Sequence, residues 1–141
     1  MAELPPQSTA AADQEIVDTL RAALPSLQAV YRYGSAGSCY ERPDSDIDLA
    51  ILADTPLDFM ALNTLAAELA RHVGREIDLN DMRRLPVTLR VQIVTHGQRL
   101  FVANRTIVDE YDSRALSDYA HLNEARRGIL DDVRARGNIY G

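Results

Sequence analysis

The chain has 141 residues, of which 46% are hydrophobic and 26% charged, a composition typical of one soluble globular domain. All 15 basic residues are arginine, and the 21 acidic residues leave a formal net charge of −6, so a broadly basic nucleic-acid-binding surface is not expected. The single cysteine, Cys39, allows no intrachain disulfide and no cysteine-rich zinc site. No apolar stretch approaches the ~20 residues that span a bilayer, and the N-terminus does not read as a signal peptide. These features favour a cytoplasmic protein.

The first part of the chain predicts one helix and two strands. Residues 1–12 are rich in Pro, Ala, Ser and Thr and are expected to form a flexible lead-in. Asp13 is the expected N-cap of a helix whose apolar residues recur at helical spacing and which ends before Pro25. Strands are expected at residues 27–33 and 46–53, the second alternating at its start and then continuously apolar.

The second part predicts alternating helices and strands, followed by a helical tail. Thr55 and Pro56 provide an N-cap and a first-turn proline for a helix that ends at Gly74. The further expected elements are a strand at 76–80, a helix from Pro86 to Gly97, a strand at 99–102 and a mostly helical tail at 106–136. The Asp112–Ser113 step or Gly128 is expected to break the tail.

This order of elements indicates an α/β (α+β) domain with one mixed sheet of four or five strands. We assign residues 13–104 to the domain and residues 105–141 to a C-terminal helical extension that packs on the domain or on a partner. The sequence pattern does not determine the order of strands in the sheet.

Two aspartates, Asp46 and Asp48, open the second predicted strand. Side chains two residues apart on a strand leave the same face, with Cα atoms roughly 6.6 Å apart, so both carboxylates are directed at one site. Such a pair suits one or two Mg²⁺ ions, which prefer carboxylate and phosphate oxygens. Asp78 lies in a similar apolar frame on the next predicted strand and would serve as a third ligand or as a base for an attacking hydroxyl, with Asp81 as the alternative.

A glycine-serine turn, Gly34-Ser35, follows the first predicted strand. Glycine lets backbone amides approach a ligand, and the serine hydroxyl donates a hydrogen bond to phosphate oxygens. A two-metal site beside such a turn is suited to in-line transfer of a nucleotidyl group. Tyr31, Tyr33 and Tyr40 flank the turn and are candidates either for stacking on a base or for ordinary packing.

The Gly-Ser turn, ten intervening residues and the Asp-x-Asp pair resemble the polymerase-β-type nucleotidyltransferase superfamily, specifically its minimal nucleotidyltransferase (MNT) members. The similarity extends to three later segments, so it covers roughly residues 14–104: Ile77-Asp78-Leu79, Leu85-Pro86 through Ile93, and Gly97-Gln98-Arg99-Leu100-Phe101. Where the family usually has a basic residue and a glycine in the loop after Gly-Ser, this chain has Ser38 and Cys39, and Arg42 is the candidate substitute cation.

The resemblance implies a polymerase-β-like nucleotidyltransferase fold that binds ATP with Mg²⁺, two ions being expected. The residues implicated are the catalytic and metal-binding triad Asp46, Asp48 and Asp78 and the nucleotide-binding residues Gly34, Ser35, Ser45 and Arg42. Many MNT proteins are antitoxins of a HEPN-family toxin, a helical ribonuclease. The resemblance therefore implies AMP transfer from ATP to a tyrosine of that toxin, within a hetero-oligomer and without direct binding of nucleic acid or membrane.

Two other functions remain open from the sequence. The altered loop at Ser38 and Cys39 motivates a binding module that neutralises the toxin by occlusion and has a weak or inactive metal site. The other is a nucleotidyltransferase that acts on a small hydroxyl compound, for which 141 residues leave little room to build an acceptor pocket.

Overall fold

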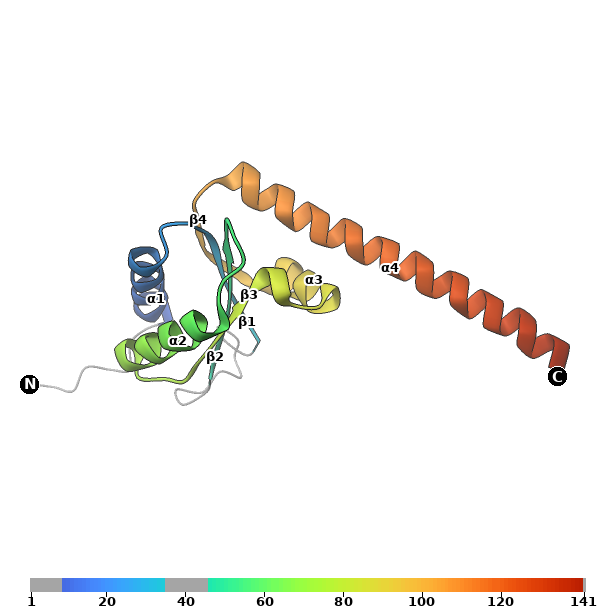
Figure 1. Ribbon diagram of the computed structural model, residues 1–141, viewed down its shortest axis with the longest axis horizontal. Coiled ribbons are helices and arrows are strands. Elements are labelled where there is room, and N and C mark those ends of the chain that lie inside the picture. The colour runs from blue at the N-terminus through green and yellow to red at the C-terminus, as the bar shows by residue number, and fades with distance from the viewer. Residues whose placement is uncertain (1–8, 35–45, 141) are drawn as a thin grey trace, which may run out of the picture.

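The computed structural model describes residues 9–34 and 46–140, with side chains described over 11–34 and 46–129. Helices and strands follow one another in the predicted order (Figure 1). In chain order they are α1 (Thr9–Ala23), β1 (Leu27–Tyr33), β2 (Ile47–Ala53), α2 (Phe59–Val73), β3 (Ile77–Asp81), the 3-10 helix η1 (Met82–Arg84), α3 (Val87–His96), β4 (Gln98–Val102) and α4 (Arg105–Tyr140). No helix of these described stretches has the length and apolarity that a membrane span needs.

The four strands form one mixed sheet in the order β3-β2-β1-β4. β1 is antiparallel to both β2 and β4, while β2 and β3 are parallel and connected through α2. This arrangement confirms the predicted α/β class with a mixed sheet. It also supplies the strand order, which places β3 directly beside β2.

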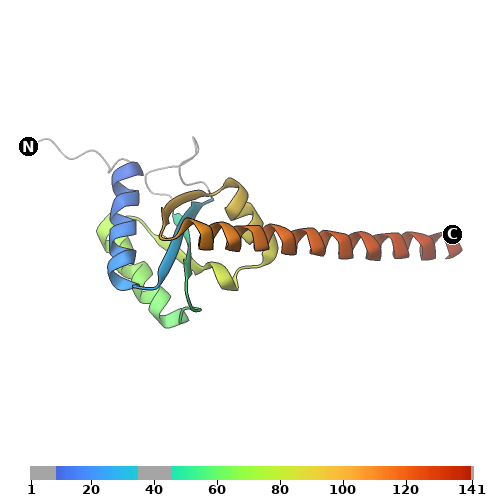
Figure 2. The same cartoon turned by 90° about the horizontal axis from the view of Figure 1, so that it is seen from above.

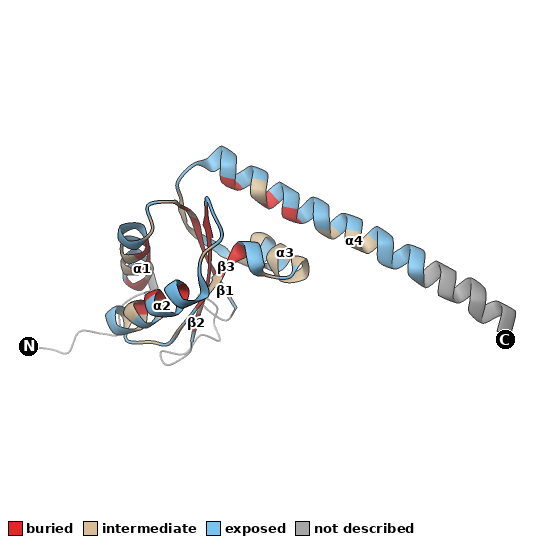
Figure 3. Ribbon diagram, in the orientation of Figure 1, coloured by how far each residue is buried: buried red, intermediate tan, exposed pale blue. Residues whose placement is uncertain are grey.

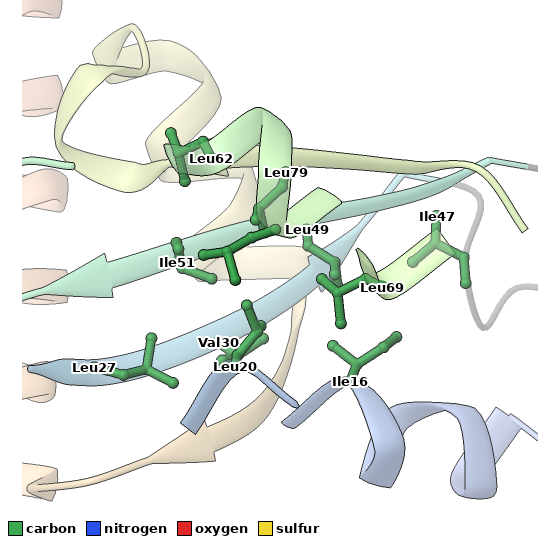
Figure 4. Close-up of a cluster of buried hydrophobic side chains, with 11 residues drawn as sticks. Ile16, Leu20, Leu27, Val30, Ile47, Leu49, Ile51, Leu62, Leu69 and Leu79 are labelled. Atoms are coloured by element: carbon green, nitrogen blue, oxygen red, sulfur yellow. The ribbon is translucent and has the colours of Figure 1, made fainter. Parts of the chain in front are cut away.

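Helices cover both faces of the sheet (Figures 1 and 2). α1 and α2 lie on one face, where alternate side chains of β1 and β2 meet apolar side chains of the two helices (Figure 4). The core on this face contains Ile16, Leu20, Leu27, Val30, Ile47, Leu49, Ile51, Leu62, Leu65, Leu69 and Leu79. Because strand side chains alternate between faces, Ala29 and Tyr31 of β1 and Ala50 and Leu52 of β2 form a second core beneath α3 and the first turns of α4.

Helix α1 begins four residues before the predicted start. Residues 9–12 read Thr-Ala-Ala-Ala, and alanine has the highest helix propensity, so the helix extends back to Thr9 and buries Ala12. Asp13 lies inside the helix, where its carboxylate pairs with the buried Arg32 of β1. The predicted cap at Asp13 is therefore wrong.

Helix α2 begins at Phe59, with Asp58 as N-cap, and not at Pro56 as predicted. The backbone N–H of Leu57 donates a hydrogen bond of 2.9 Å to the Asp81 carboxylate at the end of β3. This tertiary bond ties the chain to the sheet and delays the helix by about one turn. The predicted end at Gly74 is confirmed, because Gly74 adopts a left-handed conformation with φ of 77° and donates its N–H to the Ala70 carbonyl.

Helix α4 is one continuous element of 36 residues, so neither predicted break occurs. Its first turns cover the sheet, and the remainder projects away from the body of the molecule (Figures 1 and 2). Asp112, at the first expected break, is buried and accepts a hydrogen bond of 2.7 Å from the Tyr31 hydroxyl. That contact holds the helix on the sheet at the place where local sequence suggested an interruption.

Candidate active site

The three predicted carboxylates lie at one end of the sheet, where β1 ends and the parallel strands β2 and β3 begin. Asp46 directly precedes β2, and Asp48 is the second residue of that strand. The parallel register pairs Asp48 with Asp78 of β3. Residues that are paired across adjacent strands project from the same face, so the strand order brings Asp78 beside Asp48.

These carboxylates are on the face of the sheet covered by α3. Ala50, two residues after Asp48 on β2, belongs to the apolar core beneath α3, and strand side chains two apart share a face. Asp46 and Asp78 are exposed, whereas Asp48 is half-buried. The apolar residues later in β2 therefore anchor the strand in the core, while the polar residues at its start lie at the end of the sheet, nearer to solvent.

Gly34 brings the backbone of the turn after β1 into contact with the Asp48 side chain. Its φ is +74°, in the left-handed region that favours glycine. A Cβ atom at this position would also overlap Asp48 Oδ2. Glycine is therefore required at position 34 both by the backbone conformation and by the close approach to the Asp48 carboxylate.

The like charges of the cluster act on Asp48. Burial raises the pKa of the Asp48 carboxyl above its usual range, and the carboxylates of Asp78 and Asp46 raise it further. A divalent cation would relieve this repulsion, and carboxylate oxygens are the ligands that Mg²⁺ prefers. The donor set therefore fits Mg²⁺, with Asp46 and Asp48 as ligands and Asp78 beside them.

The carboxylates do not form a closed cage. Over residues 9–34 and 46–140, no three His, Cys, Asp or Glu side chains converge closely enough to surround an ion. Mg²⁺ is usually bound through one or two carboxylates, with the other ligands coming from substrate phosphates and water. An open, two-carboxylate arrangement therefore suits a metal that arrives with a nucleoside triphosphate.

Tyr33 and Asn80 lie beside the carboxylates, on the side toward the core of the domain. The hydrogen bond between them is not predicted from the sequence. Tyr33 lies opposite Asp48 in the β1–β2 register, and its hydroxyl accepts a hydrogen bond of 3.0 Å from Asn80 Nδ2. Burial, followed by the charges of Asp48 and Asp78, raises the pKa of Tyr33 to about 12. The sequence signal for Asn80 was its position two residues after Asp78, which places both side chains on one face of β3.

A hollow of about 480 Å³ opens beside the carboxylates, between the end of β1 and α3. Its lining combines the apolar Leu89 and Ile93 with polar groups of Gln92 and His96, and it reaches the turn at Gly34. A cavity of several hundred Å³ with a mixed lining is of the size that holds small ligands. The hollow adjoins the carboxylate cluster through Tyr33, which also lines it.

Asp81, the alternative to Asp78, has a structural role. It is buried at the end of β3, where its carboxylate accepts hydrogen bonds from the backbone N–H of Leu57 and of Arg83. Tyr31 is likewise bound to Asp112 and buried, so it packs in the core and does not face a ligand.

Six other residues singled out from the sequence lie outside the described residues: Ser35, Ser38, Cys39, Tyr40, Arg42 and Ser45. The assignment of Ser35, Arg42 and Ser45 to nucleotide binding, of Ser38 and Cys39 to the altered loop, and of Tyr40 to stacking or packing stays a prediction.

Comparison with known proteins agrees with this arrangement. The family profile "Polymerase beta, Nucleotidyltransferase" matches residues 14–106. Protein adenylyltransferase MntA of Shewanella oneidensis is 36% identical over 124 residues, covering 87% of this chain and 88% of MntA. The family match includes Asp46 and the two strands that carry Asp48 and Asp78.

Solved structures of similar chains share the fold. A chain from a crystal structure of a toxin-antitoxin with AMP-PNP has a TM-score of 0.76 and 35% identity, covering 86% of this chain and 97% of that one. A chain from the complex of tri-AMPylated Shewanella oneidensis HEPN toxin with MNT antitoxin has a TM-score of 0.74 and 33% identity, covering 89% and 98%. From its sequence, its mixed sheet and the carboxylates at the start of β2 and β3, this chain belongs to the polymerase-β-type nucleotidyltransferase family, among relatives that include the protein adenylyltransferase MntA.

Proposed function

We propose that this chain is a Mg²⁺-dependent protein adenylyltransferase of the cytoplasm that transfers AMP from ATP to a tyrosine of a HEPN-family toxin and so acts as its antitoxin. The observation that carries this proposal is the identity of 36% with protein adenylyltransferase MntA across 87% of the chain. The pairing of Asp48 with Asp78 on adjacent strands supports it, because it brings two carboxylates side by side within the stretch that matches the family profile.

The reaction forms a bond between the tyrosine oxygen and the α-phosphorus of ATP and breaks the bond to the bridging oxygen, releasing pyrophosphate. Asp46 and Asp48 would hold Mg²⁺, which neutralises charge on the triphosphate and stabilises the developing charge. Asp78, which is exposed and paired with Asp48 across the strands, would accept the proton of the attacking hydroxyl. The backbone at Gly34 would bind phosphate oxygens, and the hollow between β1 and α3 would hold the nucleoside.

ATP as the nucleotide is supported by the similar toxin-antitoxin structure that contains AMP-PNP. A tyrosine acceptor on the toxin is inferred from the resemblance to MNT antitoxins, and AMPylation of the toxin is supported by the similar complex whose toxin is tri-AMPylated. A further similar structure is of a complex carrying a double replacement of two aspartates, two positions apart, by glutamate. Asp46 and Asp48 have the same spacing in this chain.

The test is intact-mass analysis of the HEPN toxin after incubation with this chain, ATP and Mg²⁺. We expect mass increments of one or more AMP units with the unmodified chain and none with Asp46→Asn. The matched control is Asp58→Asn, because Asp58 is exposed at the start of α2 and makes no side-chain cap hydrogen bond. A toxin that is neutralised but never gains mass would contradict the proposal and favour occlusion.

A further inference from the structure

The outer part of α4 is longer than the fold requires. Ala115 is the last residue of α4 that is buried among the described side chains, and Figure 3 shows most of the described part of the helix beyond that point, up to residue 129, as exposed. Residues 117–140, which we call the arm, extend the helix by roughly 36 Å at the 1.5 Å rise per residue. Helix propensity alone holds such a segment weakly in water, so a protein surface that packs on the arm would stabilise it.

One side of the arm carries a stripe that continues the buried side of α4. Val108 is buried in the second core and Ala115, one heptad later on the same side, is also buried, and residues at spacings of three and four follow on that side of the helix. The arm stripe consists of Tyr119, Leu122, Arg126 and Ile129. Tyr119 and Leu122 are half-buried, whereas the side chain of Ile129 is 64% exposed.

The stripe faces the same side of the molecule as the carboxylate cluster. The first turns of α4 lie over the sheet face that carries Asp48, and the arm runs on from there away from the body (Figures 1 and 2). Because the stripe continues the side of the helix that contacts this face, a protein bound along the arm would approach the carboxylates. The arm thus extends the side of the molecule that carries the carboxylates, in the direction away from the body of the domain.

The chemistry of the stripe indicates its occupant. Arg126 interrupts the apolar residues with an exposed guanidinium, so a partner that buries the stripe must supply a carboxylate opposite it. A second copy of this chain in parallel register would place Arg126 against itself, which is repulsive. The net charge of −6 disfavours an anionic lipid surface.

We infer that the arm is a docking site for the protein acceptor and binds a helix of the toxin that has apolar residues at three-four spacing and a carboxylate facing Arg126. The inference rests on the proposed function for the identity of the acceptor. The hollow beside the carboxylates is of a size that holds a small ligand, whereas the arm offers an extended surface on which a helix of a protein substrate can pack. Recognition and chemistry are then carried by separate parts of the chain.

The test uses the full chain and its own HEPN toxin, with two variants in the stripe and one outside it. Ile129→Asp and Arg126→Glu change exposed side chains of the stripe, so neither disturbs the core. The matched control is Ala120→Asp, an exposed residue on the opposite side of α4 that receives the same added charge as Ile129→Asp. Circular dichroism should give equal helix content for the three variants.

Titration of the toxin without ATP should show binding weakened about tenfold or more by each stripe variant and by less than about twofold by Ala120→Asp. In the transfer reaction, KM for the toxin should rise with the stripe variants while kcat and KM for ATP stay unchanged. If Ile129→Asp bound the toxin as tightly as the wild-type chain and had the same KM for the toxin, the inference would be overturned. So would light scattering that shows a dimer of the chain alone which Ile129→Asp dissociates, because the occupant would then be a second copy.

Binding and chemistry are read separately, so the inference and the proposed function can fail independently. If the wild-type chain binds the toxin through the stripe but never labels it, the proposed transferase activity fails and the docking site stands. If the wild-type chain labels the toxin and the stripe variants do so with an unchanged KM, the activity stands and the docking site fails. Asp48→Asn serves as the reference, with expected normal binding and no labelling.

Discussion

Asp48 lies between the Gly34 turn and Asp78, and its carboxylate is held in an environment that disfavours its charge. Asp48→Asn should therefore abolish AMP transfer and at the same time stabilise the metal-free protein. Removal of the charge relieves both the desolvation and the repulsion from neighbouring carboxylates. We expect the variant to have a higher Tm than the wild-type chain near neutral pH. Thermal melting without Mg²⁺ measures it.

The pH dependence of this difference has a defined sign. Because the pKa of Asp48 is higher in the folded than in the unfolded chain, stability is lost as pH rises through that pKa. The Asn variant lacks this loss, so the two melting curves should converge at acid pH and separate toward neutral pH. Mg²⁺ should raise the Tm of the wild-type chain alone. A variant less stable than wild type at every pH would contradict this electrostatic interpretation.

The two glycines with positive φ provide a matched pair of substitutions. Gly34 and Gly74 have φ values of 74° and 77°, so alanine strains the backbone at both. A Cβ atom at Gly74 meets nothing within 4 Å, whereas one at Gly34 overlaps Asp48 Oδ2. Each variant should lose about 1 kcal/mol of stability from strain, but only Gly34→Ala should lose AMP transfer, by at least about 100-fold. Equal transfer rates in the two variants would show that the close approach to Asp48 is not needed.

The residues of the site differ in how far the sequence alone predicts their positions. The prediction that Asp46 and Asp48 face one site comes from spacing alone, because residues two apart on a strand share a face whatever its neighbours are, and the structure places Asp48 on β2 and Asp46 directly before it. Asp78 depended on β3 being adjacent to β2, which the one-dimensional pattern does not contain. Asn80 of β3 and Tyr33 of β1 are 47 positions apart in the sequence and form a hydrogen bond across β2, a contact that only the folded sheet defines.

Among the elements, errors occurred where a tertiary contact replaces a local signal. Helix α2 does not start at the predicted Thr55-Pro56, because the backbone of Leu57 is hydrogen-bonded to Asp81 instead. Likewise, the hydrogen bond between Asp112 and Tyr31 holds α4 on the sheet at an expected break. β1 was predicted at its observed bounds because an apolar strand between two turns needs no distant partner for its limits. Element type was predictable from periodicity, while element ends depended on side chains from elsewhere in the chain.

The junction of α4 with the sheet should be sensitive to alkaline pH. The Asp112 carboxylate accepts hydrogen bonds from the Tyr31 hydroxyl and from Arg99, which also donates to Asp109 at 2.8 Å. Burial first, and the Asp112 carboxylate next, raise the pKa of Tyr31 well above its usual value near 10. The folded chain keeps this phenol neutral, so stability is unaffected below about pH 10 and falls above it, by up to about 1.4 kcal/mol per pH unit for one proton.

Tyr31→Phe should make that alkaline loss shallower while lowering stability at pH 7 by about 1–3 kcal/mol, because the buried Asp112 carboxylate loses a donor. Urea unfolding at pH values from 7 to about 11 measures both effects. Tyr119→Phe is the control, since it removes a phenol from α4 at a position outside its junction with the sheet. An unchanged alkaline slope in Tyr31→Phe would exclude this junction as the source of the pH dependence.

For the whole molecule, one helix serves two purposes that deletion can separate. The first turns of α4 contribute Val108, Asp112 and Ala115 to the core, and the arm contributes none of the buried side chains described for α4. A chain that ends at Ser117 should therefore keep its fold, its Tm within a few degrees and its binding of AMP-PNP with Mg²⁺, while losing affinity for the toxin.

A chain that ends at Asn104 removes the core contribution as well. It leaves the Tyr31 hydroxyl without its acceptor and uncovers the side of the second core that Val108 fills. The expected loss of stability is roughly 3–5 kcal/mol from these contacts together, a large part of the stability of an ordinary domain. Melting curves and AMP-PNP titrations of the two truncated chains measure the difference. Unfolding of both would make the arm part of the fold, whereas full toxin binding by the chain ending at Ser117 would place the docking surface on the body of the domain.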